Sequence, residues 1–213
     1  MSEAENTEIQ AKSDPGTRVD PILDNLNIEG VELNKDQFRE AFIALWNYEE
    51  GDDKDEEEQY LLTIGVFIYT AHNILDNYNV RIDKARRFLA DALKVLKQKE
   101  RSALIEKERA SENPFKTFVK NHSAEVDETH TWKNFLLDHK TTNDQEWTYK
   151  MKRCWFSAFF IHLGRTNLIE TACLFDQIPW EERQDYVDLK LNNMFSKLGK
   201  FCQFSFKPAK KDS

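Results

Sequence analysis

The chain has few of the residues that build turns. Among its 213 residues there are only 6 Gly and 5 Pro. An all-β fold of this length needs many tight turns, and Gly and Pro supply much of the backbone geometry that such turns use. Their scarcity therefore argues against an all-β fold and favours helices.

The sequence also lacks a long hydrophobic run. No stretch reaches the roughly 18 apolar residues that a membrane helix needs. Residues 61–71 come nearest, but they include Thr63, Gly65 and Thr70. The N-terminal MSEAENTEIQ is acidic and polar, unlike the basic and then apolar pattern of a signal peptide. We therefore expect a soluble intracellular protein, cytoplasmic or nuclear, without a membrane partner.

Cysteine is scarce, and the familiar catalytic motifs are missing. The three cysteines, Cys154, Cys173 and Cys202, form no CxxC pair, so neither a zinc knuckle nor a thioredoxin-type site is indicated. We expect them to be free thiols, with Cys154 and Cys173 in apolar surroundings. There is no P-loop, GxGxxG, GxSxG, HExxH or EF-hand loop. The sequence therefore predicts no cofactor and no metal.

The histidines give only weak candidates for chemistry. A di-metal site in a helical bundle needs an acid-x-x-His motif from each of two helices, and Asp127 with His130 supplies one. His72 and Asp76 are spaced as neighbours on one helix face, which favours a local hydrogen bond. For His162 we expect a buried, hydrogen-bonded core histidine. None of these patterns predicts a catalytic site.

Aromatic residues are abundant, with 15 Phe and 5 Trp, so aromatic packing should dominate the core. Residues 147–163, WTYKMKRCWFSAFFIHL, read at helical period, are apolar over most of their circumference. Such a helix is normally buried on several sides. We therefore predict that this segment is the central helix of a bundle.

The other apolar segments are also interpreted as helices. Asn34 is a candidate N-cap, and Asn113 followed by Pro114 is another. We predict an all-α, single-domain bundle of about eight to nine helices over residues 19–199. Residues 1–18 should be a disordered acidic tail, and residues 200–213 an aromatic and basic tail. The predicted helices cover residues 19–28, 34–48, 60–78, 81–110, 114–119, 126–139, 147–163, 167–175 and 179–199.

Charge is unevenly spread along the chain. Residues 1–60 contain 18 acidic and 5 basic side chains, whereas the remainder contains 20 acidic and 25 basic ones. A disordered solubilising tail is one interpretation of the acidic head. The head could instead attract basic partners or screen a basic face of the same protein.

Two basic segments are candidate partner-binding surfaces. The C-terminal tail interleaves aromatic and basic residues, which suit either insertion into a partner's groove or folding back on the bundle. Its residues are Phe201, Phe204, Phe206, Lys200, Lys207, Lys210 and Lys211. A second basic face would consist of Arg86, Arg87, Lys94, Lys97 and Arg101.

The functional expectation depends mainly on missing motifs. We predict a non-catalytic interaction or scaffolding subunit of an intracellular complex, with a protein partner and without enzymatic activity. The alternative is a nucleic-acid-associated protein that uses the basic and aromatic C-terminal surfaces, although a pI near 5.3 counts against it. The third hypothesis is an enzyme whose residues converge from distant positions and leave no local motif.

Overall fold

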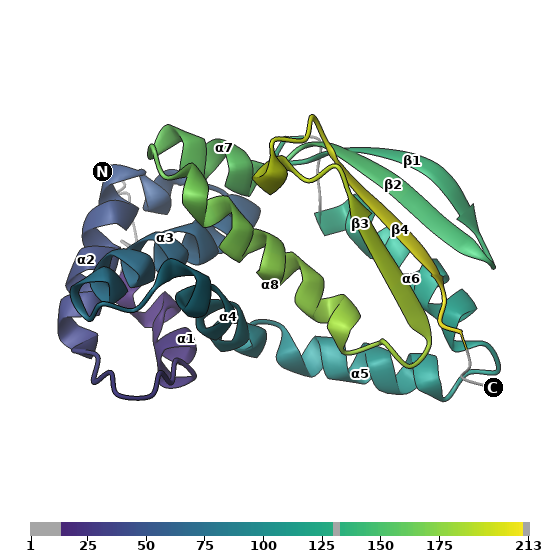
Figure 1. The fold of residues 1–213 in the computed structure, drawn as a ribbon, viewed down its shortest axis with the longest axis horizontal. Coiled ribbons are helices and arrows are strands. Elements are labelled where there is room, and N and C mark those ends of the chain that lie inside the picture. The colour runs from purple at the N-terminus through teal and green to yellow at the C-terminus, as the bar shows by residue number, and fades with distance from the viewer. Residues whose placement is uncertain (1–13, 130–132, 211–213) are drawn as a thin grey trace, which may run out of the picture.

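A computed structural model describes residues 14–129 and 133–210 and shows a mixed α/β fold (Figure 1). This part contains eight α-helices, five short 3-10 helices and one four-stranded antiparallel sheet of order β1-β2-β4-β3. The all-α prediction is therefore wrong. The helices are α1 (Asp20–Asp24), α2 (Lys35–Tyr48), α3 (Glu56–Asn77), α4 (Ile82–Ala92), α5 (Gln98–Arg109), α6 (Pro114–Thr129), α7 (Trp155–His162) and α8 (Ile169–Glu181). The strands are β1 (Leu136–Asn143), β2 (Glu146–Arg153), β3 (Val187–Asn192) and β4 (Cys202–Pro208).

The segment predicted as the central helix divides into strand β2 and the short helix α7. Within β2, Trp147, Tyr149 and Met151 are buried, at 0%, 3% and 3% exposure. This spacing of two residues is that of a strand with one face in the core. The apolar residues also fit a helical period, so the pattern alone did not separate the two. The segment forms a strand because β2 pairs with β4 in the antiparallel sheet.

The predicted C-terminal helix and tail also form strands. Val187–Asn192 is β3, and Cys202–Pro208 is β4, which lies between β2 and β3. Pro179 does not begin a helix but lies inside α8. In the predicted helix of residues 126–139, α6 continues to Thr129 and β1 begins at Leu136. Long-range strand pairing supplied the backbone hydrogen bonds that the local sequence could not indicate.

Several helix predictions are confirmed. The Asn34 side chain caps α2 by accepting hydrogen bonds from the backbone N–H groups of Asp36 and Gln37. Helix α3 begins with an acidic turn, and its buried residues include Leu62, Ile64 and Leu75. The predicted helix of residues 81–110 breaks at Lys97, which has a left-handed φ of 51° and separates α4 and a 3-10 turn (Leu93–Val95) from α5.

The helices and the sheet form two packed parts joined by α8. In Figure 1, α1 to α4 and α7 lie at one end, the sheet lies at the other, and α8 runs between them. Helices α5 and α6 lie on the side of the sheet that faces the core, and Phe118 of α6 contacts Trp147 and Phe206 of the sheet. No described helix is both long and apolar enough to cross a membrane. Of the predicted acidic tail, residues 1–13 lie outside the described part, and Pro15–Arg18 form a 3-10 helix.

Candidate functional site

A cavity of about 530 Å³ lies between the inner face of the sheet and helices α3, α5, α6 and α8. Its walls are mainly aromatic and aliphatic. Charged side chains line it at the start of α3 and α5, and we call these charged residues the rim. The rim consists of Glu56, Glu57, Lys97, Glu100 and Arg101. A concave, mostly apolar pocket of several hundred Å³ with a few polar groups is the usual form of a small-molecule site.

Asp176 is the acidic group on the inner wall of this cavity. It lies on α8 and is partly buried. No described residue forms a hydrogen bond or ion pair with its carboxyl group, and burial raises the pKa of that group from 3.8 to about 7. A carboxyl group that titrates near neutral pH can accept a proton from water and release it again, which is the requirement for a general base.

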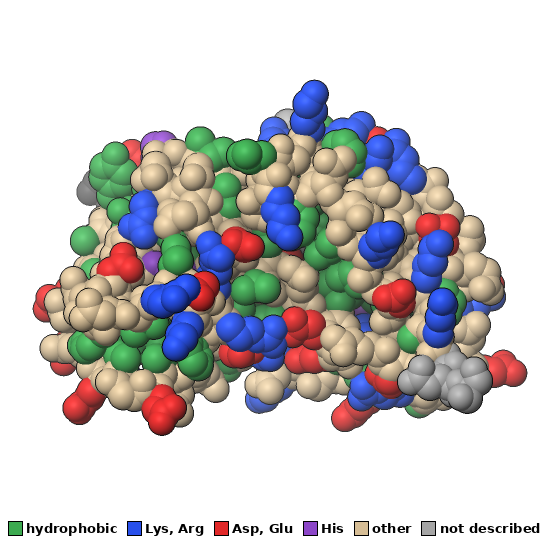
Figure 2. Space-filling view, in the orientation of Figure 1, with side chains coloured by type: hydrophobic (Ala, Val, Ile, Leu, Met, Phe, Trp, Pro, Cys, Tyr) green, Lys and Arg blue, Asp and Glu red, His purple; other side chains and the backbone are tan. Residues whose placement is uncertain are grey.

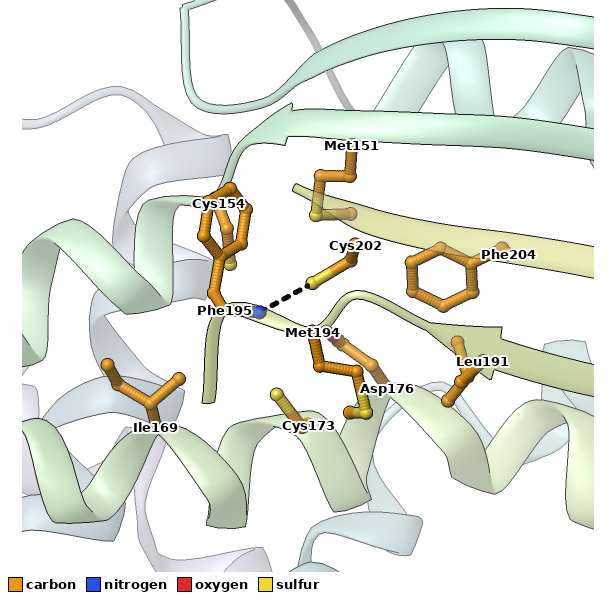
Figure 3. Close-up of a pocket in the computed structure, with 10 residues that line it drawn as sticks. All are labelled: Met151, Cys154, Ile169, Cys173, Asp176, Leu191, Met194, Phe195, Cys202 and Phe204. Atoms are coloured by element: carbon orange, nitrogen blue, oxygen red, sulfur yellow. Dashed lines mark hydrogen bonds between the residues drawn. The ribbon is translucent and has the colours of Figure 1, made fainter. Parts of the chain in front are cut away.

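Behind Asp176 lies a second chamber of about 10 Å³, enough for roughly one water-sized group. Figure 3 shows that the side chains of Cys154, Cys173 and Cys202 surround this chamber together with Asp176 and Met151. Burial raises the pKa of the Cys173 thiol to about 12 and that of the Cys202 thiol to about 11, with Asp176 adding to both shifts. The thiols are therefore protonated at neutral pH and are poor nucleophiles.

The described residues contain no group of three His, Cys, Asp or Glu placed to hold a metal ion. The second chamber, which we call the thiol chamber, shares Asp176, Met151 and Phe204 with the large cavity. None of the three cysteines lines the large cavity. Of the three residues that line both spaces, Asp176 is the one with a carboxyl group.

A buried ionic cluster supports another part of the cavity wall. The Glu108 carboxylate, with no exposed surface, lies 2.7 Å from Nε of Arg183 and 2.9 Å from Nε2 of His122. The hydroxyl of Tyr186 donates a hydrogen bond to the same carboxylate. Burial alone would raise the pKa of Glu108, but the hydrogen bonds from His122, Arg183 and Tyr186 outweigh it and lower the pKa to about 2.

His122 and Arg183 both line the cavity, yet their polar atoms are directed to the cluster. Nε2 of His122 is also 2.9 Å from Nη2 of Arg183, and Nη1 of Arg183 donates to the carbonyl of Pro179 at 2.6 Å. A buried charge needs such complete pairing to remain charged. The cluster therefore ties α5 and α6 to the segment that follows α8, beside the cavity.

Comparison with protein families gives a direct match. Residues 64–206 match the family described as L-2-amino-thiazoline-4-carboxylic acid hydrolase. This is more than half of the chain and includes β1 to β3, most of β4, Asp176 and the ionic cluster. The chain belongs to this family. Comparison with curated proteins finds no match.

Family membership corrects the functional prediction. A hydrolase family indicates an enzyme, so the predictions of a non-catalytic scaffold and of no enzymatic activity are wrong. The third hypothesis, an enzyme with residues that converge from distant positions, agrees with the finding. The nucleic-acid alternative has no support from the family.

Two solved structures resemble the chain weakly. They are an Fe(II) unliganded H-NOX protein from K. algicida and a single-substitution mutant of it. The mutant is 10% identical, with a TM-score of 0.36 over 92% of this chain and 88% of that chain. The unsubstituted protein is 9% identical, with a TM-score of 0.38 over 92% and 89% of the two chains.

The C-terminal residues predicted to bind a partner lie in or beside β4 of this hydrolase-family chain. Phe204 and Phe206 are 5% and 0% exposed and pack in the chain's own core. Phe201 is partly buried, with Nζ of Lys150 4.6 Å from its ring centroid. Lys207 lies 3.9 Å from the Glu146 carboxylate. Lys200 and Lys210 are exposed, and Lys211 lies outside the described residues.

The predicted basic face lies along α4 and the start of α5, and acidic residues neutralise most of it. Its ion pairs are Arg86 with Glu170, Arg87 with Glu181 and Asp91, Lys94 with Asp91, and Arg101 with Glu182. Nζ of Lys97 lies 4.9 Å from the centroid of the Tyr60 ring. Figure 2 shows Lys and Arg side chains over both the helical part and the sheet, with Asp and Glu side chains among them. A partner, whether protein or nucleic acid, stays a prediction.

The histidines considered in the sequence analysis contact other side chains of the chain. Nε2 of His72 is 2.9 Å from the hydroxyl of Thr171, and burial, followed by Arg165 and Arg86, lowers the pKa of His72 to about 4. His162 is exposed and not a core residue, and its Nε2 lies 3.4 Å from Glu49. The Asp127 side chain and His130 lie outside the described part of the chain.

Sequence reasoning missed Asp176, Glu108 and Arg183. One signal was present for Asp176, because it is the acidic residue within the otherwise largely apolar stretch TACLFDQIPW. An acid on a buried helix face either has a partner or has an altered pKa. Glu108 and Arg183 are 75 residues apart and gave no local signal.

Proposed function

We propose that this chain hydrolyses L-2-amino-thiazoline-4-carboxylic acid, or a close analogue with the same ring, inside the 530 Å³ cavity. In this proposal Asp176 is the general base. The observation that carries the proposal is the unpaired carboxyl group of Asp176 on the cavity wall, with a pKa of about 7.

The reaction follows from the chemistry of the ring. C2 of a 2-amino-thiazoline is bonded to the ring sulfur, the ring nitrogen and the amino group, and it is electrophilic. Asp176 takes a proton from water while the water oxygen adds to C2, and a tetrahedral intermediate results. The hydroxyl proton on C2 passes to the ring nitrogen as C2=O forms. Cleavage of C2–S then returns the Asp176 proton to sulfur and gives a thiol and a urea. Cleavage of C2–N returns it to nitrogen and gives an amine and a thiocarbamate.

The cavity provides the conditions that this step needs. Apolar walls reduce the screening around Asp176 and strengthen the interaction between its carboxylate and a ring that carries positive charge. Protonated thiols behind Asp176 leave it as the proton acceptor of this wall. We also propose that the enzyme acts inside the cell, where the three free cysteines would stay reduced.

The proposal is tested by incubating purified protein with L-2-amino-thiazoline-4-carboxylic acid and measuring the gain of one water by mass spectrometry. We expect Asp176→Asn to lower kcat/KM by roughly 10²- to 10⁴-fold, the usual contribution of general acid–base catalysis. The matched control is Asp188→Asn, because Asp188 is exposed on β3 and does not line the cavity. Equal activity of Asp176→Asn and wild type would refute the role of Asp176.

A further inference from the structure

The cavity is much larger than the substrate that the family is named for. L-2-amino-thiazoline-4-carboxylic acid has about nine non-hydrogen atoms and occupies less than about 270 Å³, which is nine times the roughly 30 Å³ that one water takes in the liquid. The cavity is about 530 Å³. Sites of this size usually enclose a drug-sized ligand and bury most of its surface.

The wall is also too apolar for so small and polar a molecule. Apart from the rim, Asp176, His122 and Arg183, every described lining residue is aromatic, aliphatic, Met or Pro. Nε2 of His122 and the Nε and Nη2 atoms of Arg183 contact the Glu108 carboxylate. A small zwitterion next to Asp176 would therefore leave most of this apolar surface in contact with water, without any gain in affinity.

We infer that the substrate of this chain is a 2-amino-thiazoline, or a similar cyclic amidine, that carries an apolar or aromatic extension of at least its own size. The reacting ring lies at Asp176, and the extension lies against the apolar wall of α3, α5, α8 and the sheet. The position of the ring rests on the proposed function. The size and apolar character of the ligand rest on the cavity alone.

The nature of the wall favours an aromatic extension in particular. Tyr149, Phe204 and Trp180 come from the sheet and α8, and the rings of Tyr149 and Phe204 are stacked at 4.8 Å. Tyr60 and Phe156 come from α3 and α7. Aromatic faces and edges attract another ring beyond the gain from burial.

The experiment compares three compounds that share the reacting ring: 2-amino-thiazoline and its 4-methyl and 4-benzyl derivatives. We expect kcat/KM to rise about fourfold from the parent to the methyl compound, which corresponds to about 0.8 kcal/mol per buried methylene. From methyl to benzyl we expect a rise of roughly 10- to 100-fold, because a phenyl ring is then buried. Equal or falling kcat/KM along the series would overturn the inference.

A variant that fills the cavity makes the test specific. Leu104 lines the cavity from α5, so Leu104→Trp should reduce the benzyl-to-methyl ratio of kcat/KM at least tenfold. The control is Ala103→Trp, since the neighbouring Ala103 is exposed and does not line the cavity; it should leave the ratio unchanged. An unchanged ratio in a folded Leu104→Trp protein would contradict the inference.

Calorimetric binding to wild type and to Asp176→Asn separates this inference from the proposed function and does not require the Leu104 variant to fold. If the benzyl compound binds at least tenfold more tightly than the methyl compound but nothing is hydrolysed, the inference holds and the proposed function fails. If the small rings are hydrolysed while the benzyl compound binds no better than the methyl one, the proposed function holds and the inference fails.

Discussion

Replacing Asp176 should stabilise the protein while it removes activity. The carboxyl group has a pKa of about 7 in the folded chain and 3.8 as its ordinary value. Between these two values the unfolded chain loses the proton while the folded chain keeps it. The stability contribution of the protonated carboxyl is therefore complete below pH 3.8 and is lost as the pH rises toward 7.

The size of the effect follows from the shift. Each pKa unit corresponds to 1.36 kcal/mol, so a shift from 3.8 to about 7 corresponds to about 4 kcal/mol at pH 8. Water that enters the cavity screens part of this cost, and we expect roughly 2–4 kcal/mol. Asn has nearly the same shape as Asp and does not titrate. Asp176→Asn should therefore be more stable than wild type by this amount at pH 8 and about equal to it near pH 4.

The assay is urea unfolding followed by tryptophan fluorescence for wild type, Asp176→Asn and the exposed control Asp188→Asn at several values between pH 4 and pH 8. The difference between wild type and Asp176→Asn should grow up to about pH 7 and then level off. For Asp188→Asn we expect a small difference throughout. If Asp176→Asn is no more stable than wild type at pH 8, the carboxylate has a favourable partner and the argument for an unpaired base is refuted.

Three further predictions follow from the core and the thiol chamber. Glu108→Gln should lower the free energy of unfolding by about 3–5 kcal/mol at pH 7 by urea titration, because a buried guanidinium loses its carboxylate. Wild type should lose stability as the pH falls from about 4.5 toward 2, since the pKa of Glu108 is lowered to about 2, and the variant should lose less because it lacks the Glu108 contribution. Phe206→Ala should cost about 3–5 kcal/mol, and clearly more than Phe201→Ala; equal effects would contradict the placement of β4 in the core. Cys173→Ser should keep ring hydrolysis within about threefold by mass spectrometry, and a loss above tenfold would indicate a thiol nucleophile instead.

The strand errors have a common physical origin. In β2 and β3 the apolar residues at alternate positions also fit a helical stripe when a few more apolar neighbours follow, as Trp155 and Phe159 do after β2. Helices make their hydrogen bonds locally, so capping and periodicity suffice to predict α2 and α3. Strands need a partner distant in sequence, such as β4 for β2, and no local signal names that partner.

The sequence by itself determined that aromatic residues would dominate the core, where α2 begins, and that familiar catalytic motifs are missing. Those properties depend on neighbouring residues and on composition. Only the tertiary structure decided that Phe204 and Phe206 complete a sheet and that a cavity lies beneath it. It also decided that Asp176 has no partner there. The pKa of a carboxyl group depends on the solvent and charges that surround it in space, and folding brings those surroundings together from distant parts of the chain.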